Sequence, residues 1–70
     1  MSEKNRFIGL YNLPGEGLVA EIITESGAHL YDRRGLQFRI LDLKQTGEDA
    51  SAEEFALLQM NSVSLDAGSR

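Results

Sequence analysis

The absence of cysteine from a chain of only 70 residues is the feature that most limits how this sequence can fold. A domain of this length builds one small apolar core, and natural domains of similar size often add disulfides, a structural metal or self-association. With no cysteine, and with His29 as the only histidine, disulfides and thiolate metal sites are excluded. We therefore expect a single domain over residues 1–70, with no metal site and no cofactor, stabilised by self-association.

The charge balance bears on the class of partner. The chain has eleven acidic and seven basic side chains, and its formal net charge is -4. Binding to a phosphate backbone depends on clustered Lys and Arg, so this balance disfavours nucleic acid. The N-terminal residues do not form a secretory leader, and no stretch approaches the roughly 20 apolar residues that span a bilayer. We expect a cytoplasmic protein with no membrane association.

Turn residues divide the first half of the chain into three predicted strands. Residues 6–13 alternate with apolar side chains on both faces, and residues 18–25 alternate with one face apolar. The Pro14-Gly15 pair between these segments favours a tight hairpin, because proline fixes φ and glycine tolerates a positive φ. A second turn at Ser26-Gly27 leads into a short third strand over residues 28–31.

A fourth strand is predicted from the next segment. Asp32 and Gly35 stand at the first and last positions of a four-residue reversal, which favours a type I turn with a glycine bulge and a positive φ at Gly35. Residues 36–43 begin with apolar side chains at alternate positions and change phase near Ile40, which suggests a bend. The polar residues 44–50 form a loop in this interpretation.

The best supported element is a helix over residues 52–61. Ser51 and Glu54 have the spacing of a capping box, in which each side chain accepts a hydrogen bond from the other residue's backbone amide. Apolar residues then recur at helical spacing in a broad stripe. Residues 1–5 and 64–70 are predicted to be flexible termini.

These elements predict an α+β domain. Its four strands form a small antiparallel meander, twisted or curled toward an SH3-like barrel, with one C-terminal helix packed on it. No helical period separates the predicted strands, so parallel crossover connections are disfavoured.

Catalysis finds little support in the residue types. His29 with Asp32 or Glu25 is the only pair that resembles a general base and its orienting partner. A chain this short has few residues from which to build an enclosing pocket, and a lone histidine beside a turn is more often a surface residue. We expect no catalytic residue and no enzymatic activity.

The leading hypothesis is a small adaptor or regulatory protein that binds another protein and forms a homo-oligomer. The predicted C-terminal helix has more apolar positions than docking on a small sheet requires, so Leu57 and Met60 are candidates for the contact. The first strand has one charge, at its start, and no proline, which protects it poorly as a sheet edge. Phe7 and Tyr11 on that strand complete the predicted protein-binding set.

The alternative hypothesis is an RNA-binding or ribonucleoprotein module. Arg33, Arg34 and Arg39 form the main basic cluster, with Tyr31 close by in sequence. RNA platforms combine such cations with exposed aromatic rings that stack on bases. A steep dependence of binding on salt concentration would distinguish this module from an adaptor.

Overall fold

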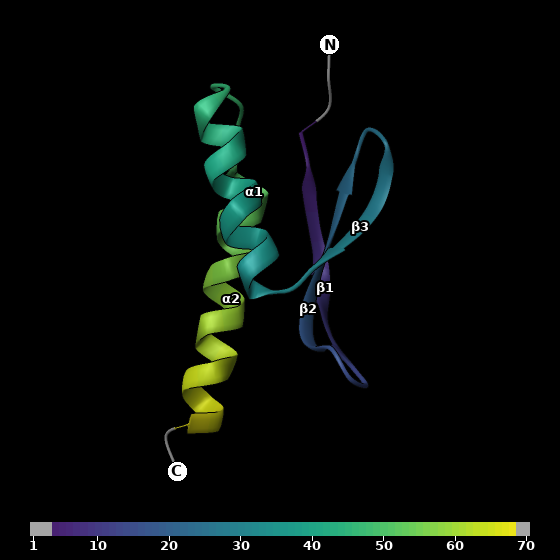
Figure 1. Cartoon of the computed structure of the whole chain (residues 1–70), viewed down its shortest axis with the longest axis vertical. Coiled ribbons are helices and arrows are strands. Elements are labelled where there is room, and N and C mark those ends of the chain that lie inside the picture. The colour runs from purple at the N-terminus through teal and green to yellow at the C-terminus, as the bar shows by residue number, and fades with distance from the viewer. Residues whose placement is uncertain (1–3, 69–70) are drawn as a thin grey trace.

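The computed structural model describes residues 4–68 of the chain, with side chains over residues 4–63. Three strands are followed by two helices in this part of the chain. They are β1 (Arg6–Leu13), β2 (Gly17–Thr24), β3 (Gly27–Tyr31), α1 (Arg33–Gln45) and α2 (Ser51–Gly68). The strands form an antiparallel sheet in the order β1-β2-β3, and both helices lie on the same side of it (Figure 1).

The first three strands confirm the sequence prediction. Pro14 and Gly15 form the turn between β1 and β2, where the Glu16 amide donates to the Leu13 carbonyl at 3.1 Å and Gly15 has a φ of 82°. Only a residue that tolerates this left-handed backbone fits there, which explains the Pro-Gly pair. The register of β1 against β2 shifts between Phe7 and Gly9, so Ile8 forms a β-bulge in the edge strand.

The prediction of a fourth strand and of a single helix is wrong. Residues 36–43 belong to α1, so the sheet has three strands, is open at β1 and β3, and does not form an SH3-like barrel. The segment fits both periods: Leu36, Phe38 and Ile40 alternate, but Leu36, Ile40 and Leu43 also recur at helical spacing and are the residues that α1 buries. The general α+β class is confirmed.

Local signals at both ends of α1 explain why the helix forms. Asp32 is the N-cap, and the predicted turn at Asp32 to Gly35 is the first helical turn, in which Gly35 does not have the positive φ that we expected. At the other end Gly47 has a φ of 76°, and the Glu48 amide donates to the Leu43 carbonyl at 2.8 Å. This is the arrangement of a Schellman motif, which commonly ends a helix at glycine.

The helix predicted over residues 52–61 is present and is longer than expected, but Ser51 is not its N-cap. α2 begins at Ser51, so Ser51 is inside the first turn and not the N-cap. The Asp49 carboxylate accepts hydrogen bonds from the Ser51 amide at 3.1 Å and from the Ser51 hydroxyl. The Glu54 amide donates to the Ala50 carbonyl at 2.8 Å, which starts the helical pattern one residue earlier than the capping box implies.

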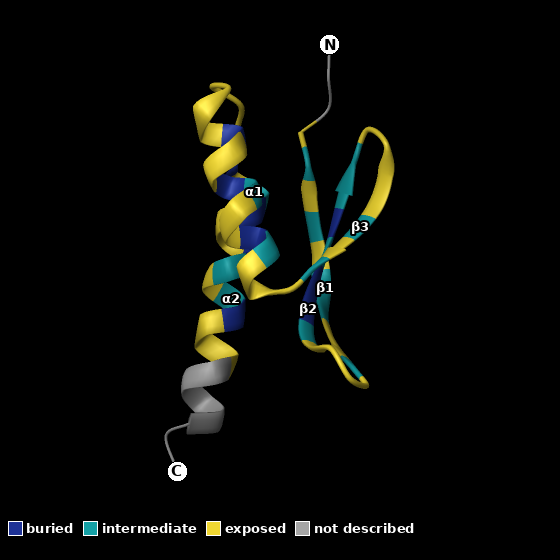
Figure 2. Cartoon of the chain, in the orientation of Figure 1, coloured by how far each residue is buried: buried dark blue, intermediate teal, exposed yellow. Residues whose placement is uncertain are grey.

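The core lies between the sheet and the helices (Figure 2). Its main cluster contains Ala20 and Ile22 of β2, Leu36 of α1, and Ala56 and Met60 of α2. A second cluster, formed by Ile40, Leu43 and Ala50, joins the two helices to the loop between them, and Leu57 packs against both clusters. Helix α2 covers β1 and β2, whereas α1 covers β2 and β3.

The predicted flexible termini fall partly outside the described residues, because residues 1–3 and 69–70 are not described. Of the remainder, Lys4 lies 3.9 Å from Asp49 and Asn5 donates to Glu53, so both residues contact the start of α2. Residues 64–68 continue the helix.

Candidate functional site

The face of the sheet turned away from the helices is the candidate functional site. Alternation along each strand sends neighbouring side chains to opposite faces. Because Ala20 and Ile22 point into the core, the residues that alternate with them along β2 point outward, as do the residues paired with these on β1 and β3. The resulting open face consists of Arg6, Ile8, Tyr11, Leu13, Val19, Glu21, Ile23, Ala28 and Leu30.

This open face is apolar and uncovered by the described elements. Ile8, Tyr11 and Leu30 are 46%, 43% and 53% exposed, and the helices contact the sheet from its other side (Figure 1). Val19 of this face is buried, and Arg6 and Glu21 are its only charged residues among those described. Sheet faces exposed to water are normally polar, so this composition is typical of an interaction surface.

The polar groups at the centre of the open face are paired with each other. Tyr11 Oη donates a hydrogen bond to Glu21 Oε1 at 2.7 Å across the β1–β2 pair. This bond and the negative charge of Glu21 raise the pKa of the Tyr11 phenol above its ordinary value, because both favour the protonated phenol. Tyr11 therefore presents its ring to solvent while its hydroxyl is already satisfied.

The helices also expose large apolar side chains. Phe38 and Leu41 project from α1, and Phe55 and Leu58 project from α2. Phe55 turns toward β1 and packs edge-on against Phe7, with ring centroids 5.6 Å apart. The exposed apolar residues of the sheet, by contrast, share one face that the described helices do not contact.

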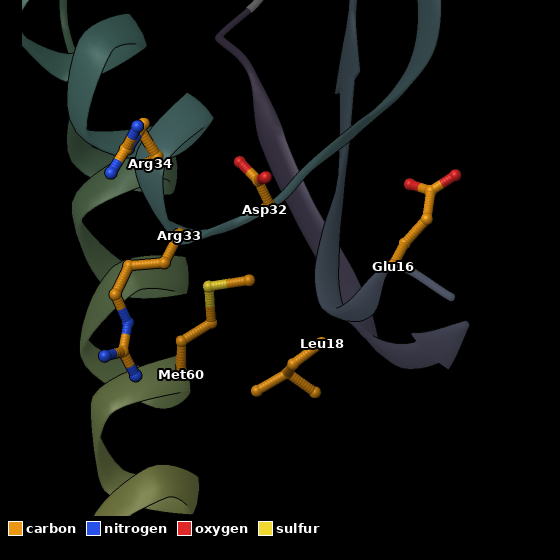
Figure 3. A pocket seen from close by; sticks show the side chains of 6 residues that line it. All are labelled: Glu16, Leu18, Asp32, Arg33, Arg34 and Met60. Carbon is orange, nitrogen blue, oxygen red and sulfur yellow. The ribbon is translucent and has the colours of Figure 1, made fainter. Parts of the chain in front are cut away.

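A hollow of about 340 Å³ lies between the start of α1, the β1–β2 hairpin and α2 (Figure 3). It is lined by Glu16, Leu18, Asp32, Arg33, Arg34 and Met60. Two cations and two carboxylates line this hollow, and Asp32 is already used as the cap of α1. The lining thus has no net charge that would select an anion or a cation.

The predicted protein-binding residues are mostly placed in the core. Met60 is buried in the main cluster, and Phe7 and Leu57 are half-buried against it. Only Tyr11 of the four lies on the open face with a largely accessible ring. Sequence reasoning missed Ile8, Ile23 and Leu30 as site residues. The apolar character of both faces of residues 6–13 was an available signal for Ile8.

The predicted basic residues and Tyr31 lie on different elements. Arg33 and Arg34 lie in the first turn of α1. Arg39 lies later in the same helix and pairs at 3.2 Å with Asp42, which is one turn after it. Tyr31 is half-buried against the main cluster and its ring stacks on His29 at a centroid distance of 6.2 Å. The arginines therefore lie on the helix while the aromatic ring is held against the core.

The candidate catalytic histidine has a structural partner. His29 Nε2 lies 2.9 Å from Ser26 Oγ within the β2–β3 turn, so its ring is bonded to a hydroxyl rather than to Asp32 or Glu25.

Within residues 4–68 no helix combines the length and the apolar character needed to cross a membrane.

The chain was compared with models of protein families, with curated protein sequences and with solved structures, and none of the three comparisons found a match.

Proposed function

We propose that this chain is a non-enzymatic adaptor or regulatory protein that binds another protein through the open face of its sheet. One observation supports this proposal most directly: the face exposes Ile8, Tyr11 and Leu30, with Arg6 and Glu21 as its only charged residues. An apolar surface of this kind is unfavourable in water, and a protein partner that covers it removes that cost. The cysteine-free composition is compatible with the cytoplasm, which we propose as the location.

The proposal can be tested with two matched variants. Leu30→Glu places a charge on the open face, and Leu58→Glu places the same charge on α2, where the leucine is 62% exposed. Both leucines are largely accessible, so neither change should disturb the core. Affinity capture with the wild-type chain and with each variant should yield proteins that are lost with Leu30→Glu and retained with Leu58→Glu.

Two outcomes would contradict the proposal. The first is a set of captured proteins that is the same for all three chains, which would place binding elsewhere. The second is recovery of nucleic acid that falls steeply as salt rises, because that dependence indicates phosphate contacts.

A further inference from the structure

We infer that the protein bound on the open face is a second copy of this chain, packed sheet to sheet about a two-fold axis. This inference rests on the proposed function, since it names the occupant of the same surface. The arrangement buries Ile8, Tyr11, Ile23 and Leu30 of each copy against the same residues of the other, as a two-fold contact requires. Two sheets packed in this way form the middle of a four-layer assembly with the helices outside.

The charges of the open face favour a second copy. The chain has a net charge of -4, so two copies repel each other unless they meet at a neutral patch. The open face has one cation, Arg6, and one anion, Glu21. The Arg6 side chain has no hydrogen bond or ion pair with other described residues, and Tyr11 bonds only one oxygen of the Glu21 carboxylate.

Symmetry converts these two charges into complementary pairs. Any two points on a flat contact are exchanged by the two-fold axis that lies in the contact plane and bisects the line between them at a right angle. Such an axis places Arg6 of each copy over Glu21 of the other, so one rotation forms two ion pairs. A second copy therefore supplies both opposite charges at once, and like charges need not meet.

The size of the face sets the expected strength of the contact. An eight-residue strand such as β1 is roughly 26 Å long, and three strands about 5 Å apart give a footprint of a few hundred Å². Specific interfaces bury about 800 Å² on each partner, so this contact is smaller than a standard interface and belongs with weak, transient ones. We expect a dimer that dissociates in the micromolar range. Such an association also supplies the stabilisation that a short chain without cysteine lacks.

The test is the mass of the full chain by sedimentation equilibrium across a range of micromolar concentrations. The wild-type chain should reach the mass of a dimer. Leu30→Glu should weaken association at least about tenfold, because each dimer would bury two added charges. Leu58→Glu adds the same charge on α2 and should leave association unchanged. Circular dichroism of each variant checks that the fold is retained.

A charge exchange tests the orientation of the two copies. Arg6→Glu and Glu21→Arg should each weaken the dimer by roughly 2- to 30-fold, the range expected for two partly exposed ion pairs. The double variant should recover most of the lost affinity, because the pairs form again with their signs reversed. Because the double variant would also restore a pair within one copy, a mixture of the two single variants separates the cases: their heterodimer restores both ion pairs between copies and none within a copy.

A folded wild-type chain that stays monomeric at hundreds of micromolar would overturn this inference. So would a dimer that Leu58→Glu dissociates and Leu30→Glu does not, or a double variant no tighter than the single ones. These failures differ from failure of the proposed function. A monomer that still captures another protein through Leu30 would refute self-association and leave the binding role of the open face intact.

Discussion

The Asp32 carboxylate accepts a hydrogen bond from the backbone amide of Gly35 at 2.7 Å and so caps the first turn of α1. The Leu36 amide donates to the Asp32 carbonyl at 2.9 Å, which begins the helical pattern at the same residue. Arg33 and Arg34 follow directly, and cations there oppose the positive end of the helix dipole. The start of α1 therefore depends on the Asp32 side chain more than the start of an average helix depends on its N-cap.

The first prediction concerns this cap. Asp32→Ala removes the acceptor for the Gly35 amide and the negative charge beside two arginines, so it should lower the free energy of unfolding by about 1 kcal/mol. Asp32→Asn keeps a capping oxygen without the charge and should lose less. Urea denaturation of the three chains measures the difference. Equal midpoints for wild type and Asp32→Ala would show that the cap contributes nothing.

The same residue explains where sequence reasoning failed for the fold. An aspartate that bonds the amide three residues later is common to a type I turn and to a helix N-cap, so Asp32 and Gly35 alone do not distinguish them. The segment after them fits both the strand and the helix period. Burial of Leu36, Ile40 and Leu43 against α2 and the sheet decides between the two, and this is a tertiary effect.

The candidate site was predictable only in part. The strand boundaries of β1 and the Pro14-Gly15 turn follow from local chemistry, and they place Tyr11 at an edge strand. Which face of β1 meets the helices could not be read from its residues, because both faces are apolar. Likewise α2 has apolar side chains all round, so the burial of Met60 and the exposure of Leu58 depend on where the helix docks.

The second prediction concerns the buried Glu53 carboxylate of α2. Its Oε2 accepts a hydrogen bond from Asn5 Nδ2 at 2.8 Å, while its Oε1 is buried without a partner among the described residues. Asn5→Ala removes the one bonded donor and should destabilise the fold by about 1–3 kcal/mol. Glu53→Met replaces the carboxylate with an apolar side chain of similar length and should be neutral or stabilising.

Thermal and urea unfolding of these two variants provide the measurement. Glu53→Gln is the matched control, because it keeps the shape of the side chain and removes its charge. The interpretation fails if Asn5→Ala is as stable as wild type, or if Glu53→Met is the less stable of the two.

The third prediction concerns the hydroxyl of Tyr11. Its hydrogen bond to Glu21 and the charge of that carboxylate raise the pKa of the phenol in the folded chain. A raised pKa means that this contribution to stability is complete below the ordinary tyrosine range near about 10 and is lost as pH rises through the folded value. Glu21→Gln should therefore lower the pKa of Tyr11.

Ultraviolet absorbance of the ionised phenol follows this titration. Tyr31→Phe removes the other tyrosine, so the signal then belongs to Tyr11 alone. An unchanged titration midpoint on adding Glu21→Gln would show that the two side chains do not interact in solution.

The last prediction concerns Asp49, whose carboxylate precedes α2. Hydrogen bonds from the Ser51 hydroxyl and the Ser51 amide lower the pKa of this carboxyl, and Lys4 at 3.9 Å adds to the effect. A lowered pKa gives stability that is present above the ordinary aspartate value of about 3.9 and is lost as pH falls through the folded value. Asp49→Asn cannot titrate, so the advantage of the wild-type chain over this variant should be constant near neutral pH and disappear on acidification. Urea midpoints measured from pH 7 downward test this, with Asp42→Asn as a control on α1. If the advantage of wild type over Asp49→Asn persists at the lowest pH at which both chains fold, the carboxylate of Asp49 does not stabilise the start of α2 through its charge.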